Sequence, residues 1–154
     1  MEDSGVRAAT TPRETALSRT WSGDIAILAL RLAMGVVFTY HGWLKLDDVS
    51  GFAGFVDSLG IPAPTFVAYV VTYLELLGGV ALIIGLATRY VAALFAIEMV
   101  FTTVLVKLDV GLIATEGAGA ELDILLLAIA LSLVLTGAGR WSVDALIVGR
   151  RRGT

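Results

Sequence analysis

The stretch IAILALRLAMGVVFTYHGWLK, residues 25–45, decides the fold, because it holds a single charge, Arg31, before its final Lys45. A bilayer hydrocarbon core of ~30 Å needs roughly 20 helical residues at 1.5 Å each. This stretch is therefore long enough to cross a membrane. Lipid cannot satisfy open backbone N–H and C=O groups, so the segment must be helical.

Three more apolar runs follow, over about 66–87, 90–108 and 122–138, without the polar stripes of a soluble bundle. The chain is 57% hydrophobic and 16% charged, with a mean hydropathy of +0.86. Soluble domains are nearer 45–50% apolar and ~25% charged. We expect an all-α fold, a transmembrane four-helix bundle. Its short connections favour antiparallel neighbours, and small residues such as Gly35 and Gly79 favour close packing.

The ends of the chain differ from the membrane domain, which we place at 25–144. Residues 1–24 are polar and lack the features of a signal peptide, so we expect a loose N-terminal tail. Residues 145–154 form a basic C-terminal tail.

Basic residues predict the orientation of the spans. Eight arginines would lie on one side of the membrane: Arg7, Arg13, Arg19, Arg89, Arg140, Arg150, Arg151 and Arg152. The other side has only Lys45 and Lys107. The positive-inside rule therefore predicts a multi-pass protein of the bacterial plasma (inner) membrane with cytoplasmic N- and C-termini.

A short interfacial helix is predicted in the first outer loop, from Ser50, its expected N-cap, to Leu59. The apolar residues of this segment recur on one helical face. Gly60 and Pro62 then end the helix.

The composition also limits the chemistry. The chain has no cysteine and one histidine, His41. A disulfide framework, a thiolate metal site and a multi-histidine metal site are therefore not expected. No nucleotide-binding loop or nucleophile triad is visible, no catalytic residue can be assigned, and no nucleic-acid partner is indicated.

Three ionisable residues, Arg31, Glu75 and Glu98, lie well inside the predicted spans, and His41 lies nearer the outer face. Charges at this depth cost ~2.5–3.5 kcal/mol on insertion scales, so they usually face the bundle interior and pair. We expect Arg31 to pair with Glu75 or Glu98, and His41 to face Glu75. Arg31, His41 and Lys45 lie on one stripe of the first helix and can line one surface.

Two interpretations of this polar interior stay open. In the first, an interior salt bridge fixes the register of the helices. In the second, the interior is a cavity for a small molecule, a quinone headgroup or a proton path. One arginine can neutralise only one glutamate, so the other would carry a proton or meet His41. A group of aromatic residues is either a membrane-interface belt or a stacking wall for a ligand: Phe38, Tyr40, Trp43, Phe66, Tyr69 and Tyr73.

The ordered series of motifs is similar to one family. It comprises Arg31-Leu-Ala-Met-Gly35, His41-Gly42, Glu75-Leu-Leu-Gly78-Gly79, Gly85-Leu-Ala-Thr88-Arg89 and Gly137-Ala-Gly139-Arg140-Trp-Ser142-Val-Asp144. From about Ile25 to Asp144 the chain resembles the DoxX family of small four-helix bacterial membrane proteins. The family's polar positions correspond to Arg31, His41, Lys45, Glu75 and Arg89, whereas Glu98 is outside its pattern.

The resemblance implies a membrane subunit of an oxidoreductase or of an oxidative or thiol-stress complex, in contact with a quinone. It implies no other cofactor. Two alternatives remain: a non-catalytic anchor or assembly factor for a soluble partner, and a small transporter. The expected partners are the lipid bilayer, redox proteins and a second copy of the chain.

Overall fold

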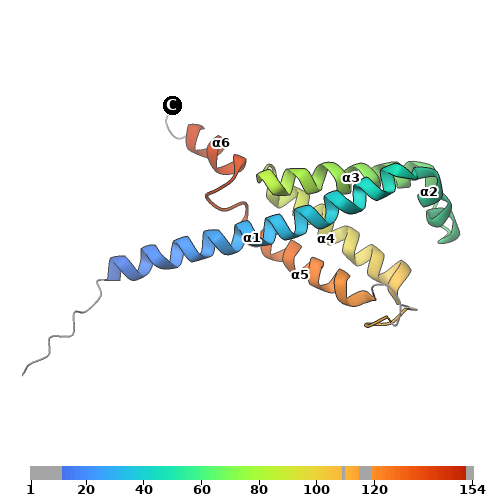
Figure 1. Ribbon diagram of the computed structural model, residues 1–154, viewed down its shortest axis with the longest axis horizontal. Helices are drawn as coiled ribbons and strands as arrows, with labels where there is room; N and C mark the ends of the chain where they lie inside the picture. The colour runs from blue at the N-terminus through green and yellow to red at the C-terminus, as the bar shows by residue number, and fades with distance from the viewer. Residues whose placement is uncertain (1–11, 109, 115–118, 152–154) are drawn as a thin grey trace, which may run out of the picture.

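The computed structural model describes residues 12–108, 110–114 and 119–151, and every regular element in these ranges is helical. The elements are α1 (Pro12–Asp47), α2 (Val49–Ser58), α3 (Pro64–Ile84), α4 (Thr88–Thr102), the π-helical turn η1 (Thr103–Lys107), α5 (Ala120–Thr136) and α6 (Val143–Arg151) (Figure 1). The predicted all-α membrane fold is confirmed.

Among the residues that the structure describes, three helical segments are long and apolar enough to cross a membrane: Trp21–Asp47, Pro64–Ile84 and Thr88–Lys107. They correspond to the first three predicted spans. The fourth, α5, has 17 residues and extends over about 25 Å, somewhat less than a bilayer core. Its crossing of the membrane stays a prediction.

The first helix is longer than predicted. It begins at Pro12, so the part of the predicted loose tail from Pro12 to Asp24 is helical, and residues 1–11 lie outside the described range. Proline fits the first position of a helix, and alanine, leucine, glutamate and arginine in this segment are good helix formers. Figure 1 shows this end of α1 extending beyond the other helices.

Close contact between α1 and α3 depends on glycine. A Cβ on Gly35 would lie 2.8 Å from the carbonyl oxygen of Gly79, and a Cβ on Gly42 would collide with the backbone of Leu76. Larger side chains would therefore separate the two helices. This confirms the predicted packing role of Gly35 and Gly79.

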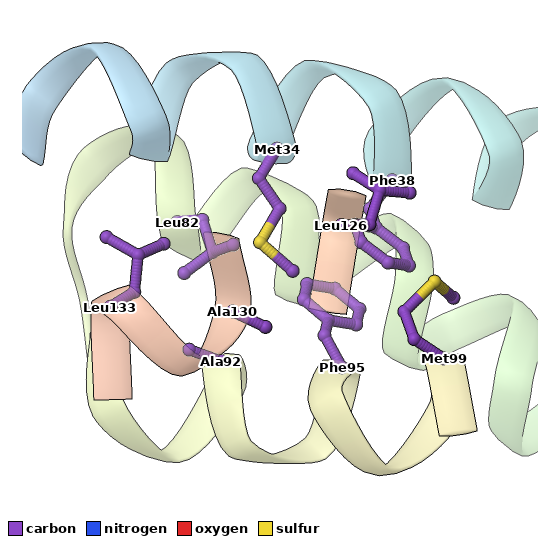
Figure 2. Packing of buried hydrophobic residues seen from close by; sticks show 9 residues of the cluster. All are labelled: Met34, Phe38, Leu82, Ala92, Phe95, Met99, Leu126, Ala130 and Leu133. Atoms are coloured by element: carbon purple, nitrogen blue, oxygen red, sulfur yellow. The ribbon is translucent and has the colours of Figure 1, made fainter. Parts of the chain in front are cut away.

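The apolar core lies among α1, α3, α4 and α5. The rings of Phe38 and Phe95 stack in parallel, 3.7 Å apart between centroids. Figure 2 shows the core residues: Met34, Phe38, Leu82, Ala92, Phe95, Met99, Leu126, Ala130 and Leu133.

The helix predicted over 50–59 is present as α2, but its cap differs from the prediction. Asp48 Oδ1 accepts hydrogen bonds from the backbone N–H of Gly51 at 2.8 Å and from the Ser50 hydroxyl at 3.0 Å. Asp48 is thus the N-cap, because α2 begins at Val49 and Ser50 already lies inside the helix. At the other end, the chain turns at Gly60, whose φ is +73°.

Candidate functional site: a cavity at the α2 end of the bundle

A cavity of about 610 Å³ lies among α1, α2, α3, α4, η1 and α5. Most of its lining is apolar, with aromatic rings from Phe38, Phe52, Phe55 and Phe101. The ionisable residues that line it are His41, Lys45, Glu75, Glu98 and Asp123. An apolar cavity of this size with a few polar groups is typical of a small-molecule site.

Lys45 and Glu75 form the central ion pair of the cavity, between Lys45 Nζ and Glu75 Oε1. The side chain of Glu75 is 4% exposed, so this pair holds a carboxylate away from water. The Lys45 ammonium group also lies 4.9 Å from the centre of the Phe52 ring, which connects the pair to α2. Lys45 can pair with Glu75 because the Gly42 contact holds their helices together.

Glu98 adds a second carboxyl group from α4. It lies close enough to Glu75 for a hydrogen bond between the two groups. Among the described residues, Glu75 Oε2 and Glu98 Oε2 are buried without a hydrogen-bond partner. Lys45 neutralises one of the two acids, so a proton or a ligand donor is needed to satisfy the other.

Asp123 is a cavity residue that the sequence analysis missed. It is 6% exposed, and its Oδ2 has no hydrogen-bond partner among the described residues. The carboxyl group interacts with Thr103 and Lys107 of η1 and electrostatically with His41. An acidic residue directly after the start of an apolar run was the signal that could have identified it.

His41 lines the cavity from α1 but is itself exposed. Its described electrostatic partner is Asp123, on α5, whereas the sequence analysis expected Glu75. His41 therefore lies where the cavity meets the surface.

The predicted pairing of Arg31 with a glutamate is wrong. Arg31 is 1% exposed and donates four hydrogen bonds to backbone carbonyl oxygens, to Leu82 at 2.9 Å, Ile83 at 2.9 Å, Ala138 at 2.7 Å and Trp141 at 2.8 Å. The carbonyls at the C-terminal end of a helix lack partners within the helix and carry partial negative charge, so they can replace a carboxylate. Arg31 thus lies outside the cavity.

Arg89 also lies outside the cavity. It is exposed at the start of α4 and donates to the carbonyl oxygen of Leu135 at 3.3 Å. Arg31 and Arg89 join the end of α5 and the following turn to α3 and α4. Of the six candidate residues, the structure brings four together, namely His41, Lys45, Glu75 and Glu98.

Most of the predicted aromatic wall faces outward. Phe38 alone of the six aromatics lines the cavity, and the other five are exposed: Tyr40, Trp43, Phe66, Tyr69 and Tyr73. Their exposure fits a membrane-interface belt. The aromatic part of the cavity comes from α2 and α4 instead.

The long apolar helices define an integral membrane protein whose described elements are all helical. The family model of DoxX matches residues 26–108, more than half of the chain. The chain belongs to the DoxX family, as its motifs indicated.

Its relatives include membrane proteins from several bacteria. The chain is 38% identical over 133 residues to the Bacillus subtilis protein named "Putative oxidoreductase CatD", covering 86% of this chain and 95% of that protein. It is 34% identical to an uncharacterized membrane protein of Mycobacterium tuberculosis, over 79% of this chain and 81% of the relative. It is 29% identical to the Escherichia coli "Inner membrane protein YqjF", over 80% and 93%. No solved structure matches the chain. The orientation of the termini stays a prediction.

Proposed function

We propose that the chain is a quinone-binding membrane subunit of an oxidoreductase. The observation that carries this proposal is the apolar cavity of about 610 Å³, in which the Lys45–Glu75 pair and Glu98 are the polar centre. A quinone has an apolar tail and a headgroup with two carbonyl oxygens. Such a molecule matches a cavity that is mostly apolar and polar at one place.

The polar groups suit both redox forms of the headgroup. The Lys45 ammonium can donate a hydrogen bond to a quinone carbonyl, and Glu75 Oε2 and Glu98 Oε2 can accept from the hydroxyls of a quinol. Reduction of a quinone to a quinol takes two electrons and two protons. In this proposal the carboxyl groups hold protons for the headgroup, and the ring of Phe52 packs beside it.

The electrons come from a partner redox protein in this proposal. The chain has no cysteine, so its own side chains cannot relay electrons as dithiols. The name of the Bacillus subtilis relative supports a role in oxidoreduction without specifying a substrate.

The proposal is tested by purifying the protein in mild detergent and measuring the quinone extracted with it. Wild-type protein should retain quinone, and Lys45→Gln and Glu75→Gln should each lose most of it. Asp57→Asn is the matched control, because Asp57 is exposed on α2 and does not line the cavity. Equal retention by all four proteins, or none by the wild type, would refute quinone binding at this site.

The same preparation separates the alternatives. An anchor or assembly factor predicts reproducible crosslinks to a soluble protein that persist in Glu75→Gln. A transporter predicts solute flux in proteoliposomes that Glu75→Gln abolishes. A quinone-binding subunit predicts that deletion of the gene lowers quinone reduction by membranes and that Lys45→Gln fails to restore it.

A further inference from the structure

Three carboxyl groups on three different helices line the cavity, namely Glu75 on α3, Glu98 on α4 and Asp123 on α5. Each has one oxygen that is buried without a hydrogen-bond partner among the described residues. Glu75 and Asp123 are 3% and 6% exposed, respectively. Unsatisfied carboxyl oxygens at this depth are costly, so a cavity that keeps three of them calls for a mobile donor.

The three groups line the same cavity as His41. Glu98 interacts with Glu75 on one side and electrostatically with Asp123 on the other. Asp123 in turn interacts electrostatically with His41, which is exposed. The ionisable groups that interact with Glu98 or Asp123 from neighbouring positions are His41 and Lys45 of α1, Lys107 of η1 and Glu121 of α5.

We propose, resting on the proposed function, that Asp123 and His41 form a proton relay between the surface and the Glu75–Glu98 pair. In one step, protonated Asp123 gives its proton to the Glu98 carboxylate through water in the cavity that both residues line. The resulting Asp123 carboxylate takes a proton from the His41 imidazolium by the same route, and His41 takes one from water. Each cycle moves one proton inward and leaves every relay group as it began, and the reverse order moves one outward.

The Thr103 hydroxyl can adjust to both the protonated and the ionised form of Asp123. Its hydroxyl donates to the carbonyl oxygen of Met99 at 2.8 Å and also lies within hydrogen-bonding reach of Asp123. A hydroxyl has one proton to donate, so it can turn toward an ionised Asp123 and back to Met99 when Asp123 is protonated. Thr103 opens the π-helical turn η1, and such turns often occur at functional sites.

His41 suits the outer end of the relay because it is exposed and lines the cavity. Asp123 suits the middle because it lies in the cavity with a free oxygen. The relay gives a specific role to the two cavity residues that the quinone proposal does not use.

The test follows proton exchange at the Glu75–Glu98 pair without turnover. After dilution of quinone-free protein into D₂O, time-resolved infrared spectra record the shift of the protonated carboxyl C=O band. The band is assigned to the pair by its loss in Glu75→Gln and Glu98→Gln. Asp123→Asn should slow this exchange about 10-fold or more, since a positioned acid or base typically contributes 100-fold or more to a proton transfer.

Asp123→Glu should restore the rate, and His41→Gln should slow exchange as Asp123→Asn does. The control Asp57→Asn should exchange at the wild-type rate. Exchange at the wild-type rate in folded Asp123→Asn would overturn the relay. If Asp123→Asn does not fold, His41→Gln decides the question, and an unchanged rate in that variant overturns it.

Retained quinone is measured separately in each variant. Asp57→Asn should keep the wild-type amount, because Asp57 does not line the cavity. If the wild-type protein retains no quinone but Asp123→Asn still exchanges protons slowly, the proposed function is refuted and the relay is supported.

Discussion

The guanidinium group of Arg31 donates a hydrogen bond of 2.7 Å to the carbonyl oxygen of Ala138, 107 positions away along the chain. Together with its bonds to Leu82, Ile83 and Trp141, this contact fixes the turn after α5 against the end of α3. Gly85 allows this arrangement, because a Cβ there would lie 2.6 Å from Arg31 Cζ. The least exposed charged side chain of the described residues therefore joins the end of α3 to the turn after α5.

Arg31→Leu should destabilise the protein by at least about 3 kcal/mol. Hydrogen bonds to charged groups contribute ~1.5–3 kcal/mol each, and four carbonyl oxygens would lose their donor. The melting temperature in detergent measures this loss. Arg140→Leu is the matched control and should change stability by less than about 1 kcal/mol, since Arg140 is exposed and lies 3.8 Å from Asp24. Equal melting temperatures for the two variants would show that the four hydrogen bonds of Arg31 do not stabilise the protein.

Asp144→Ala should destabilise the start of α4 by about 1–2 kcal/mol, as loss of an N-cap usually does. Asp144 accepts hydrogen bonds from the backbone N–H groups of Ala87 and Thr88, at 2.8 and 2.9 Å. It also holds Ala87 in a left-handed conformation with φ of +49°. Hydrogen exchange should increase at these two amides. Ser142→Ala, which removes the hydroxyl that accepts from Ala145, should instead loosen α6. If hydrogen exchange increased at the same amides in both variants, Asp144 and Ser142 would not cap α4 and α6 separately.

Gly42→Ala and Gly54→Ala should act in opposite directions. A Cβ at Gly42 would strike the Leu76 backbone, and overpacking of this kind costs about 1–3 kcal/mol or more. A Cβ at Gly54, inside α2, would meet nothing within 4 Å. This second substitution should stabilise α2 by about 0.5–1 kcal/mol, because alanine loses less backbone entropy than glycine. Thermal unfolding in the same detergent compares them. A stable Gly42→Ala protein would show that α1 and α3 do not need this contact.

Lys45→Met should cost about 3–5 kcal/mol, because it leaves the buried Glu75 carboxylate uncompensated, and Glu75→Met should cost less, because the Lys45 side chain is 21% exposed. The double variant should be more stable than the sum of the two losses predicts, since it removes both charges. A double-mutant cycle of unfolding free energies measures the coupling. Strictly additive losses would mean that the ion pair contributes nothing.

The N-cap of α2 should depend on pH. Hydrogen bonds from Gly51 and Ser50 lower the pKa of the Asp48 carboxyl below its ordinary value. The cap is therefore at full strength above the ordinary carboxyl range near pH ~4 and is lost as pH falls through the lowered pKa. The NMR shift of the Gly51 amide should follow this titration with a midpoint below that of an aspartate in an unfolded peptide. In Asp48→Asn the shift should stay flat over the same range, and a midpoint at or above the unfolded value would contradict the cap.

Much of the fold could be predicted because apolar runs determine membrane helices directly. The predicted 66–87 and 90–108 spans match Pro64–Ile84 and Thr88–Lys107 within a few residues. Gly60 marks the end of α2, and Gly35 marks a close helix contact. In each case the residues at that position are themselves the physical reason for the span, the helix end or the close helix contact.

The site could be predicted only in part. Lys45, Glu75, Glu98 and His41 were expected in the interior, because charge within an apolar run is an obvious signal. The partners of Arg31 could not be predicted, since they are backbone carbonyls, which every residue has. Asp123 was hidden by its position at the edge of a long apolar run, and its burial depends on how α5 packs on α4 and η1.

The contacts of Arg31 also bear on the order of assembly. During synthesis, Arg31 emerges long before Ala138 and Trp141, which supply two of its four acceptors. Until those residues are made, a guanidinium in the first span has only the end of α3 to satisfy it, an expensive state in lipid. The chain therefore gains its full stability only with its last segment, and a protein stopped before residue 138 should be an early target for membrane proteases.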